Sequence, residues 1–262
     1  MKPIVPSPPP GPYPLRYDPL PDHTQLPDRE GGNPLRPYTG RIPDHTTLPD
    51  QNGTFAHNSY DRWQSHLLTD SLLPQADRLF PQGDYFIGAD CGIYWRLTDP
   101  PAKGVKAPDW FFVADATRLL DGQMRRSFVL WEEGVAPLIV LEYVYGDGAE
   151  ERDRTPREGN LWVYERVLRC PYYGIFAPND ARLELYVLGD GRYSPLEPND
   201  SGRFPINRLN IQIGTWRGIF GGFEAPWLRW WDERGYLMLT GAERAERLAA
   251  KLRELGVDPE AL

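Results

Sequence analysis

Residues 137–145 read Pro-Leu-Ile-Val-Leu-Glu-Tyr-Val-Tyr, an apolar run that contains a single acidic residue, Glu142. Turn signals bound the run, and its aliphatic residues favour a central β-strand. A second apolar run, Trp110 to Val113, follows Pro108 and Asp109 directly. We therefore predict two strands in the middle of a sheet, each associated with one carboxylate.

A carboxylate in such a strand is costly to desolvate unless it is paired, protonated or bound to a cation. If the two strands are adjacent, Asp109 and Glu142 meet, and their oxygen atoms are hard ligands of the kind that hold Mg²⁺. A bound Mg²⁺ polarises a phosphodiester and acidifies an attacking water. The alternative is that each acid is a structural residue paired with an arginine, and the two acids alone do not decide between these interpretations.

The remaining patterns predict a mixed α/β domain. Leucines near helical spacing predict a helix that begins after Asn58 and kinks or breaks at Pro74. The tryptophans of residues 227–231 favour core packing over stacking on bases. Other runs predict strands at Tyr85–Gly88, Gly92–Leu97 and Tyr172–Phe176, a helix at Leu161–Leu168 and a hairpin around Gly189–Gly191.

The two ends of the chain differ from the domain expected over residues 57–239. Residues 1–56 contain fourteen of the 28 prolines and few aliphatic residues, which predicts an irregular arm. Residues 240–262 begin with Thr240 and Glu243 at capping-box spacing and continue as an apolar stripe to Gly256, which predicts an amphipathic helix. That helix either packs on its own domain or joins two copies in a homodimer.

Composition limits the class of function. The net charge of -8 argues against a broadly basic nucleic-acid surface but not against a local basic groove. No run approaches the roughly 20 apolar residues of a membrane span, and no secretory signal begins the chain, so we expect a cytoplasmic protein without a membrane partner. Cys91 and Cys170 fit neither a disulfide framework nor a four-ligand zinc site and are expected to be buried thiols.

Four motifs follow one another in a characteristic order. They are Pro-Asp before an apolar strand, Leu-Glu-Tyr-Val in a second strand, Gly-Asn-Leu-Trp-Val-Tyr-Glu at 159–165 and Pro-Tyr-Tyr-Gly-Ile-Phe at 171–176. From about Asn58 to Thr240, this order resembles the putative restriction endonuclease domain family that is abundant in cyanobacteria. The resemblance implies a restriction-endonuclease-like α/β core, with a central mixed sheet flanked by helices, plus extra β hairpins and a C-terminal helix.

The resemblance also assigns roles to residues. Asp109, Glu142 and the Tyr143 carbonyl would bind Mg²⁺, or Mn²⁺ in its place. The superfamily lysine lies two residues beyond the second acid, here Val144, or on the following helix, here near Asn160, and both positions lack lysine. The chain has four lysines, Lys2, Lys103, Lys106 and Lys251, and none lies between residues 107 and 250.

With the lysine position held by Asn160, an arginine is expected to supply the positive charge. The candidates are Arg152, Arg154 and Arg157, and we place Arg157 in the catalytic set with Asn160. Guanidinium stays protonated and cannot act as a general base at neutral pH. If Asn160 lies within side-chain reach of both acids, Asn160→Lys should raise metal-dependent cleavage.

The function implied by the resemblance is a Mg²⁺-dependent DNA endonuclease that hydrolyses phosphodiester bonds. In this mechanism a metal-activated water attacks phosphorus and a cationic side chain neutralises the developing charge. The alternative is a catalytically inactive member that acts as a binding or assembly protein, which the missing lysine and the acidic net charge favour.

Overall fold

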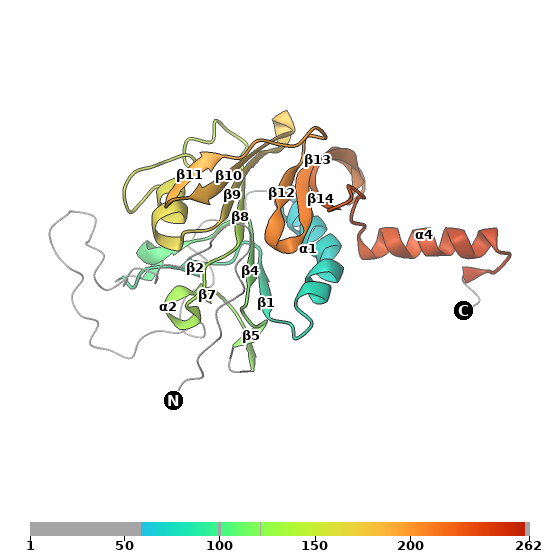
Figure 1. The fold of residues 1–262 in the computed structure, drawn as a ribbon, viewed down its shortest axis with the longest axis horizontal. Coiled ribbons are helices and arrows are strands. Elements are labelled where there is room, and N and C mark those ends of the chain that lie inside the picture. Colours follow the sequence, from blue (N-terminus) through green and yellow to red (C-terminus); the bar gives the residue numbers. More distant parts are fainter. Residues whose placement is uncertain (1–58, 99–100, 121, 260–262) are drawn as a thin grey trace.

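The computed structural model describes residues 59–98, 101–120 and 122–259, so the arm expected over residues 1–56 lies outside the described residues. The protein is a mixed α/β protein built around a six-stranded sheet (Figure 1). In spatial order the strands are β1 (Tyr85–Gly88), β4 (Trp110–Ala114), β8 (Ile139–Tyr143), β9 (Tyr172–Ala177), β10 (Arg182–Gly189) and β11 (Arg192–Pro195).

The predicted central strand is confirmed as β8, in which all five residues are buried. It pairs antiparallel with β4 and parallel with β9. A parallel connection needs a crossover, and here the crossover is the short helix α3 (Asn160–Trp162), which continues as the π-helical η2 (Val163–Leu168). The predicted helix over Leu161–Leu168 is therefore present, and it covers one face of the sheet at the end of β8.

Side chains of β4 alternate between two hydrophobic cores. Trp110 and Phe112 enter the core shared with helix α1 (Ser59–Leu79) and the second sheet, whereas Phe111 and Val113 enter the core shared with α3 and η2. The second sheet has the order β12 (Phe204–Ile206), β13 (Ile211–Phe220) and β14 (Phe223–Asp232). A third sheet has the order β3 (Val105–Lys106), β2 (Ile93–Tyr94) and β7 (Phe128–Val129).

The remaining elements are short, except for the C-terminal helix. They are β5 (Leu119–Leu120), β6 (Gln123–Met124), α2 (Leu130–Glu133), the 3-10 turns η1 (Pro101–Gly104), η3 (Pro178–Asp180) and η4 (Asn207–Leu209), and α4 (Gly241–Glu254). Within the described residues, no helix is long and apolar enough to cross a membrane.

Three local predictions need correction. Of the kink or break expected at Pro74, the break does not occur: helix α1 continues through the proline to Leu79, because Leu72 and Ala76 on either side of it are fully buried in the core. The strand expected over Gly92–Leu97 is limited to Ile93 and Tyr94. Cys91 is only partly buried because it precedes this strand in a loop, whereas Cys170 is buried as predicted.

Other predictions are confirmed. The hairpin of β10 and β11 turns through Asp190 and Gly191, both at positive φ, as a two-residue turn of this kind requires. The tryptophans of residues 227–231 pack in the core, since Trp227 and Trp230 are fully buried and Trp231 is nearly so.

Helix α4 begins with the predicted capping box between Thr240 and Glu243. Figure 1 shows it extending away from the rest of the protein, and none of its residues is buried. Leu248 is 66% exposed and Leu255, which follows the helix, is 69% exposed. The apolar stripe is therefore not covered by the described part of its own chain.

Candidate active site

Adjacent strands bring the two predicted acids together. In the antiparallel pair of β4 and β8, Trp110 lies opposite Leu141, and one further step of this register sets Asp109 opposite Glu142. Both side chains are buried, with 7% of Asp109 and 8% of Glu142 exposed. Residues opposite one another in such a pair point to the same face of the sheet. The face in question is the one that α3 and η2 cover.

Hydrogen bonds fix each carboxylate. The backbone N–H of Tyr143 donates to the Asp109 carboxylate, and the hydroxyl of Tyr164, on η2, donates to Oε1 of Glu142 over 2.7 Å. On the opposite face, Ser65 of α1 donates to the carbonyl oxygen of Asp109 over 3.1 Å. Backbone and side chain of both acids are thus held by neighbouring elements.

Burial disfavours the ionised form of both acids. It raises the pKa of Glu142 to about 8, although the hydroxyl of Tyr164 acts in the opposite direction. Burial also raises the pKa of Asp109 well above its ordinary value, and the negative charge of Glu142 adds to this effect. Two such carboxylates side by side gain stability in their ionised form when a cation joins them.

The donor set fits Mg²⁺. The described residues contain no group of three or more His, Cys, Asp or Glu side chains arranged to hold a metal. Mg²⁺ is nevertheless commonly bound through one or two carboxylates and retains several waters. Asp109 and Glu142 supply two carboxylates, and Tyr143, the last residue of β8, can add its backbone carbonyl. A calcium site with six to eight protein oxygens would not fit this arrangement.

A lysine lies close enough to Glu142 for its charge to act on that carboxylate, although it precedes both acids in the sequence. The ammonium of Lys106, on β3, donates to Oδ1 of Asn160 over 2.5 Å and to the carbonyl of Glu158 over 2.7 Å. Its positive charge also acts on Glu142. Lys106 thus brings an ammonium to the position on the crossover helix where the sequence has Asn160.

The chain between Lys106 and Asp109 is constrained. Lys106 pairs with Ile93 in the third sheet, and Pro108 has a fixed φ and restricts Ala107 to extended conformations. These constraints fix the backbone of Lys106 relative to that of Asp109. The side chain of Lys106 therefore extends to Asn160 from a backbone whose position is fixed.

Asn160 is positioned by a close backbone approach. It is buried as the first residue of α3 and follows Gly159, which is the N-cap. A Cβ on Gly159 would collide with the backbone carbonyl of Asp153, so only glycine fits here without a shift. The loop between β8 and α3 is in this way packed against the start of the helix that presents Asn160.

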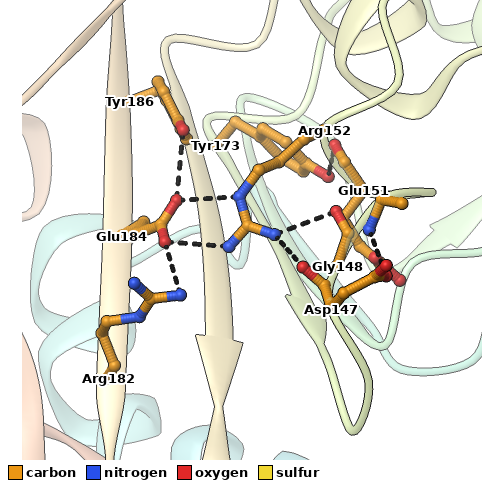
Figure 2. A network of polar contacts seen from close by, with 9 residues as sticks. Asp147, Gly148, Glu151, Arg152, Tyr173, Arg182, Glu184 and Tyr186 are labelled. Atoms are coloured by element: carbon orange, nitrogen blue, oxygen red, sulfur yellow. Dashed lines mark hydrogen bonds and ion pairs between the residues drawn. The ribbon is translucent and has the colours of Figure 1, made fainter.

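The arginines predicted to supply charge are mostly committed elsewhere. Arg152 forms two hydrogen bonds with Glu184 of β10, at 2.8 and 3.1 Å, and donates to the carbonyls of Asp147 and Gly148 (Figure 2). Arg154 pairs with Glu165 at 3.1 Å. Arg157 lies in the turn before Gly159 in left-handed backbone, with φ 68°. The structure therefore assigns Arg152 to holding the loop rather than to the acids.

Aromatic packing connects this loop to Glu142. Figure 2 shows the hydroxyl of Tyr173, on β9, donating to the carbonyl of Glu151 in the loop. The ring of Tyr173 lies 4.8 Å from the ring of Tyr164, whose hydroxyl binds Glu142. Both tyrosines are fully buried. The loop that contains Glu151, strand β9 and helix η2 thus pack together around the Glu142 carboxylate.

Reasoning from the sequence found both acids and Asn160 but missed Lys106 and Tyr164. In the superfamily order, the lysine comes after the second acid. Lys106 precedes the first acid, three residues before Asp109, and this spacing was the one available signal. Nothing in the order of residues shows that β3 lies beside the start of α3.

The chain matches the model of a known protein family. Residues 54–218 match the family model Uma2, described as putative restriction endonuclease. A search of curated proteins finds no match. The matched range includes both acids, Lys106, Asn160 and Tyr164.

Proposed function

The chain belongs to the Uma2 family of putative restriction endonucleases, and from this premise we propose that it is a Mg²⁺-dependent DNA endonuclease. The observation that supports the proposal best is the register of β4 and β8, which sets two buried carboxylates opposite one another. The antiparallel strands β1, β4 and β8, followed by a helical crossover to the parallel strand β9, agree with a restriction-endonuclease-like core.

In this proposal Asp109, Glu142 and the Tyr143 carbonyl hold Mg²⁺, with Mn²⁺ as an alternative. A bound divalent ion supplies a Lewis acid to the phosphodiester and lowers the pKa of a coordinated water. The N–H of Tyr143 and the hydroxyl of Tyr164 orient the two carboxylates. Because both carboxylates must be ionised to act as ligands, binding of the metal releases protons.

DNA, the proposed substrate, needs a local positive surface because the chain as a whole is acidic. Such a surface includes η2, the helix that also carries Tyr164, where three arginines surround the single carboxylate of Glu165: Arg154, Arg166 and Arg192. Their side chains are 51%, 33% and 70% exposed, whereas that of Glu165 is 2% exposed. Three cations against one anion leave positive charge available to phosphates.

A plasmid nicking assay with Mg²⁺ tests the proposal. The wild type should cut supercoiled DNA, and the double variant Asp109→Asn, Glu142→Gln should not. Glu243→Gln is the matched control, since the Glu243 carboxylate, on α4, pairs with Arg229 and contacts neither Asp109 nor Glu142. In parallel, calorimetric titration with Mn²⁺ should give binding by the wild type and none by the double variant. Equal titrations would refute the metal site.

The second candidate function is assembly without catalysis. The observation that favours it is the uncovered apolar stripe of α4, on which Leu248 is exposed. A homodimer that joins two copies of α4 would bury this stripe. Sedimentation of the wild type and of Leu248→Glu tests this, because the variant should be the lighter species if α4 forms the dimer.

A further inference from the structure

The ammonium of Lys106 is held at the first residue of α3 and acts electrostatically on the buried Glu142, an arrangement that a lysine tying two segments together would not require. We infer that Lys106 is the catalytic cation that contacts the phosphate to be cleaved, and that Asn160 is a positioning residue that aims it. The inference rests on the proposed endonuclease function and adds to it a residue from outside the expected motif.

The hydrogen bonds of Lys106 leave one donor available. An ammonium has three N–H donors and no acceptor. Two of them point to Oδ1 of Asn160 and to the carbonyl of Glu158. Both partners are neutral acceptors, and among the residues that the structure describes no carboxylate forms an ion pair with Lys106 at hydrogen-bonding distance. The third N–H, which has no acceptor among the described residues, can donate to a phosphate oxygen.

The electrostatic surroundings require this charge. A phosphate that approached Asp109 and Glu142 would bring a third negative charge to a partly desolvated place. The negative charges that act on Lys106 come from Glu142, Glu150, Asp153 and Glu158. The ammonium of Lys106, near these carboxylates, makes the local potential less negative before a substrate binds. Groups fixed in advance stabilise developing charge without reorganisation.

Asn160 has a defined part in this arrangement. Its Oδ1 accepts from Lys106, and its backbone is fixed by the close approach of Asp153 to Gly159. The carboxamide thus orients an ammonium that comes from another strand. A second ammonium at position 160 would repel the first, so Asn160→Lys alone should lower cleavage. This reverses the expectation drawn from the sequence.

The first experiment removes the charge. Lys106→Gln keeps an N–H donor for Glu158 and Asn160 but is neutral, and Lys106→Met removes the donor as well. Each should reduce single-turnover cleavage at saturating Mg²⁺ by about 100-fold or more, the effect expected of a preorganised group that stabilises charge. Lys103→Gln, which removes an equal charge from an exposed site three residues away, should stay within about twofold of wild type.

The second experiment moves the charge. The double variant Lys106→Met, Asn160→Lys puts one ammonium back at the same place from the other element, and it should recover at least about tenfold over Lys106→Met. A purely structural role for Lys106 would not be rescued in this way. Mn²⁺ affinity supplies a readout apart from cleavage, because loss of a neighbouring cation should leave it equal to wild type or tighter.

The outcomes separate the inference from the function on which it rests. If wild type and both Lys106 variants cleave equally, Lys106 is not catalytic, and the endonuclease proposal survives. If Lys106→Gln retains full cleavage while Lys106→Met loses it together with thermal stability, the lysine is structural and the inference is refuted. If the wild type itself leaves DNA intact, the endonuclease proposal fails and the inference fails with it.

Discussion

Glu142 and Glu165 are both buried glutamates, the first in contact with the crossover helix and the second on it, yet the protein surrounds them differently. Glu142 accepts from the neutral hydroxyl of Tyr164 and from the backbone N–H of Asp109. Glu165, the next residue after that tyrosine, accepts from the N–H of Tyr193 over 2.8 Å and is met by the guanidinium groups of Arg154 and Arg166. Consecutive residues of η2 thus face two different electrostatic environments.

The pKa shifts of the two acids have opposite signs for this reason. Burial raises the pKa of Glu142 to about 8. Burial acts in the same direction on Glu165, but the N–H of Tyr193 and the charge of Arg154 lower its pKa below the ordinary value. An acid whose partners neutralise it stabilises the fold. An acid left without a cation at hydrogen-bonding distance is the better candidate for binding something from outside.

The largest expected effect comes from making Glu142 neutral. Glu142→Gln should reduce Mg²⁺-dependent cleavage by about 1,000-fold, because it removes one of the two carboxylates proposed to bind the metal. The same variant should be at least as stable as wild type in the absence of divalent metal, since an amide has no charge to desolvate. Nicking assays and thermal melts in EDTA measure the two quantities. If Glu142→Gln cleaves at the wild-type rate, the difference in role drawn between Glu142 and Glu165 is wrong.

Glu165→Gln should give the opposite result. It leaves Arg154 and Arg166 without their carboxylate and should lower the free energy of unfolding by about 2 kcal/mol, reduced from the value for a fully buried pair because the arginines are partly exposed. Cleavage per folded molecule should stay within about tenfold of wild type, because Glu165 is not a ligand. Urea denaturation provides the measurement. A stability equal to wild type would show that the arginines do not need this partner.

The sequence predicts the surroundings of Glu142 better than those of Glu165. The acid pair follows from two apolar runs, since strands with that composition occupy the middle of a sheet and so lie close together. The surroundings of Glu165 come from Arg154 in a loop and Arg192 on β11, which no local pattern connects.

The position of Lys106 could not be predicted from the sequence for a similar reason. Strands β2 and β3 are two residues long, too short for any periodicity, and their pairing depends on contacts distant in sequence. Extra β hairpins were expected in this part of the chain, but the residues of the long β13–β14 hairpin were not located, because Gly214, Gly218 and Pro226 interrupt its alternation. Elements with continuous apolar runs could be predicted from the sequence, whereas the contacts between short elements could not.

A pH series of unfolding sharpens the comparison for Glu165. Its pKa in the folded protein lies below the ordinary value of 4.5, so the carboxylate stabilises the native state above that pH. This stabilisation is lost as the pH falls through the lower, folded value. The difference in unfolding free energy between wild type and Glu165→Gln should therefore be constant from about pH 6 to 8 and shrink on acidification. A difference that grows as pH falls would contradict the assigned sign.

The smallest expected effect concerns the tyrosine that lies between the two environments. Tyr164→Phe removes the hydroxyl that binds Glu142 but keeps the ring packed on Tyr173. Its matched control is Tyr193→Phe, which removes another buried hydroxyl, one that donates to the carbonyl of Cys170 over 2.8 Å. Each variant should lose about 1 kcal/mol of stability, the net value of one buried hydrogen bond.

Metal affinity should then separate these two tyrosines. Groups that orient a ligand typically change metal affinity by about tenfold or more, so Tyr164→Phe should weaken Mn²⁺ binding while Tyr193→Phe leaves it unchanged. The reason is that Tyr164 fixes the direction in which Glu142 presents its oxygens, whereas Tyr193 contacts neither acid through its hydroxyl. Calorimetric titration of both variants decides the matter. Equal affinities would mean that the hydroxyl of Tyr164 only satisfies a buried carboxylate, and that Glu142 is oriented by its strand alone.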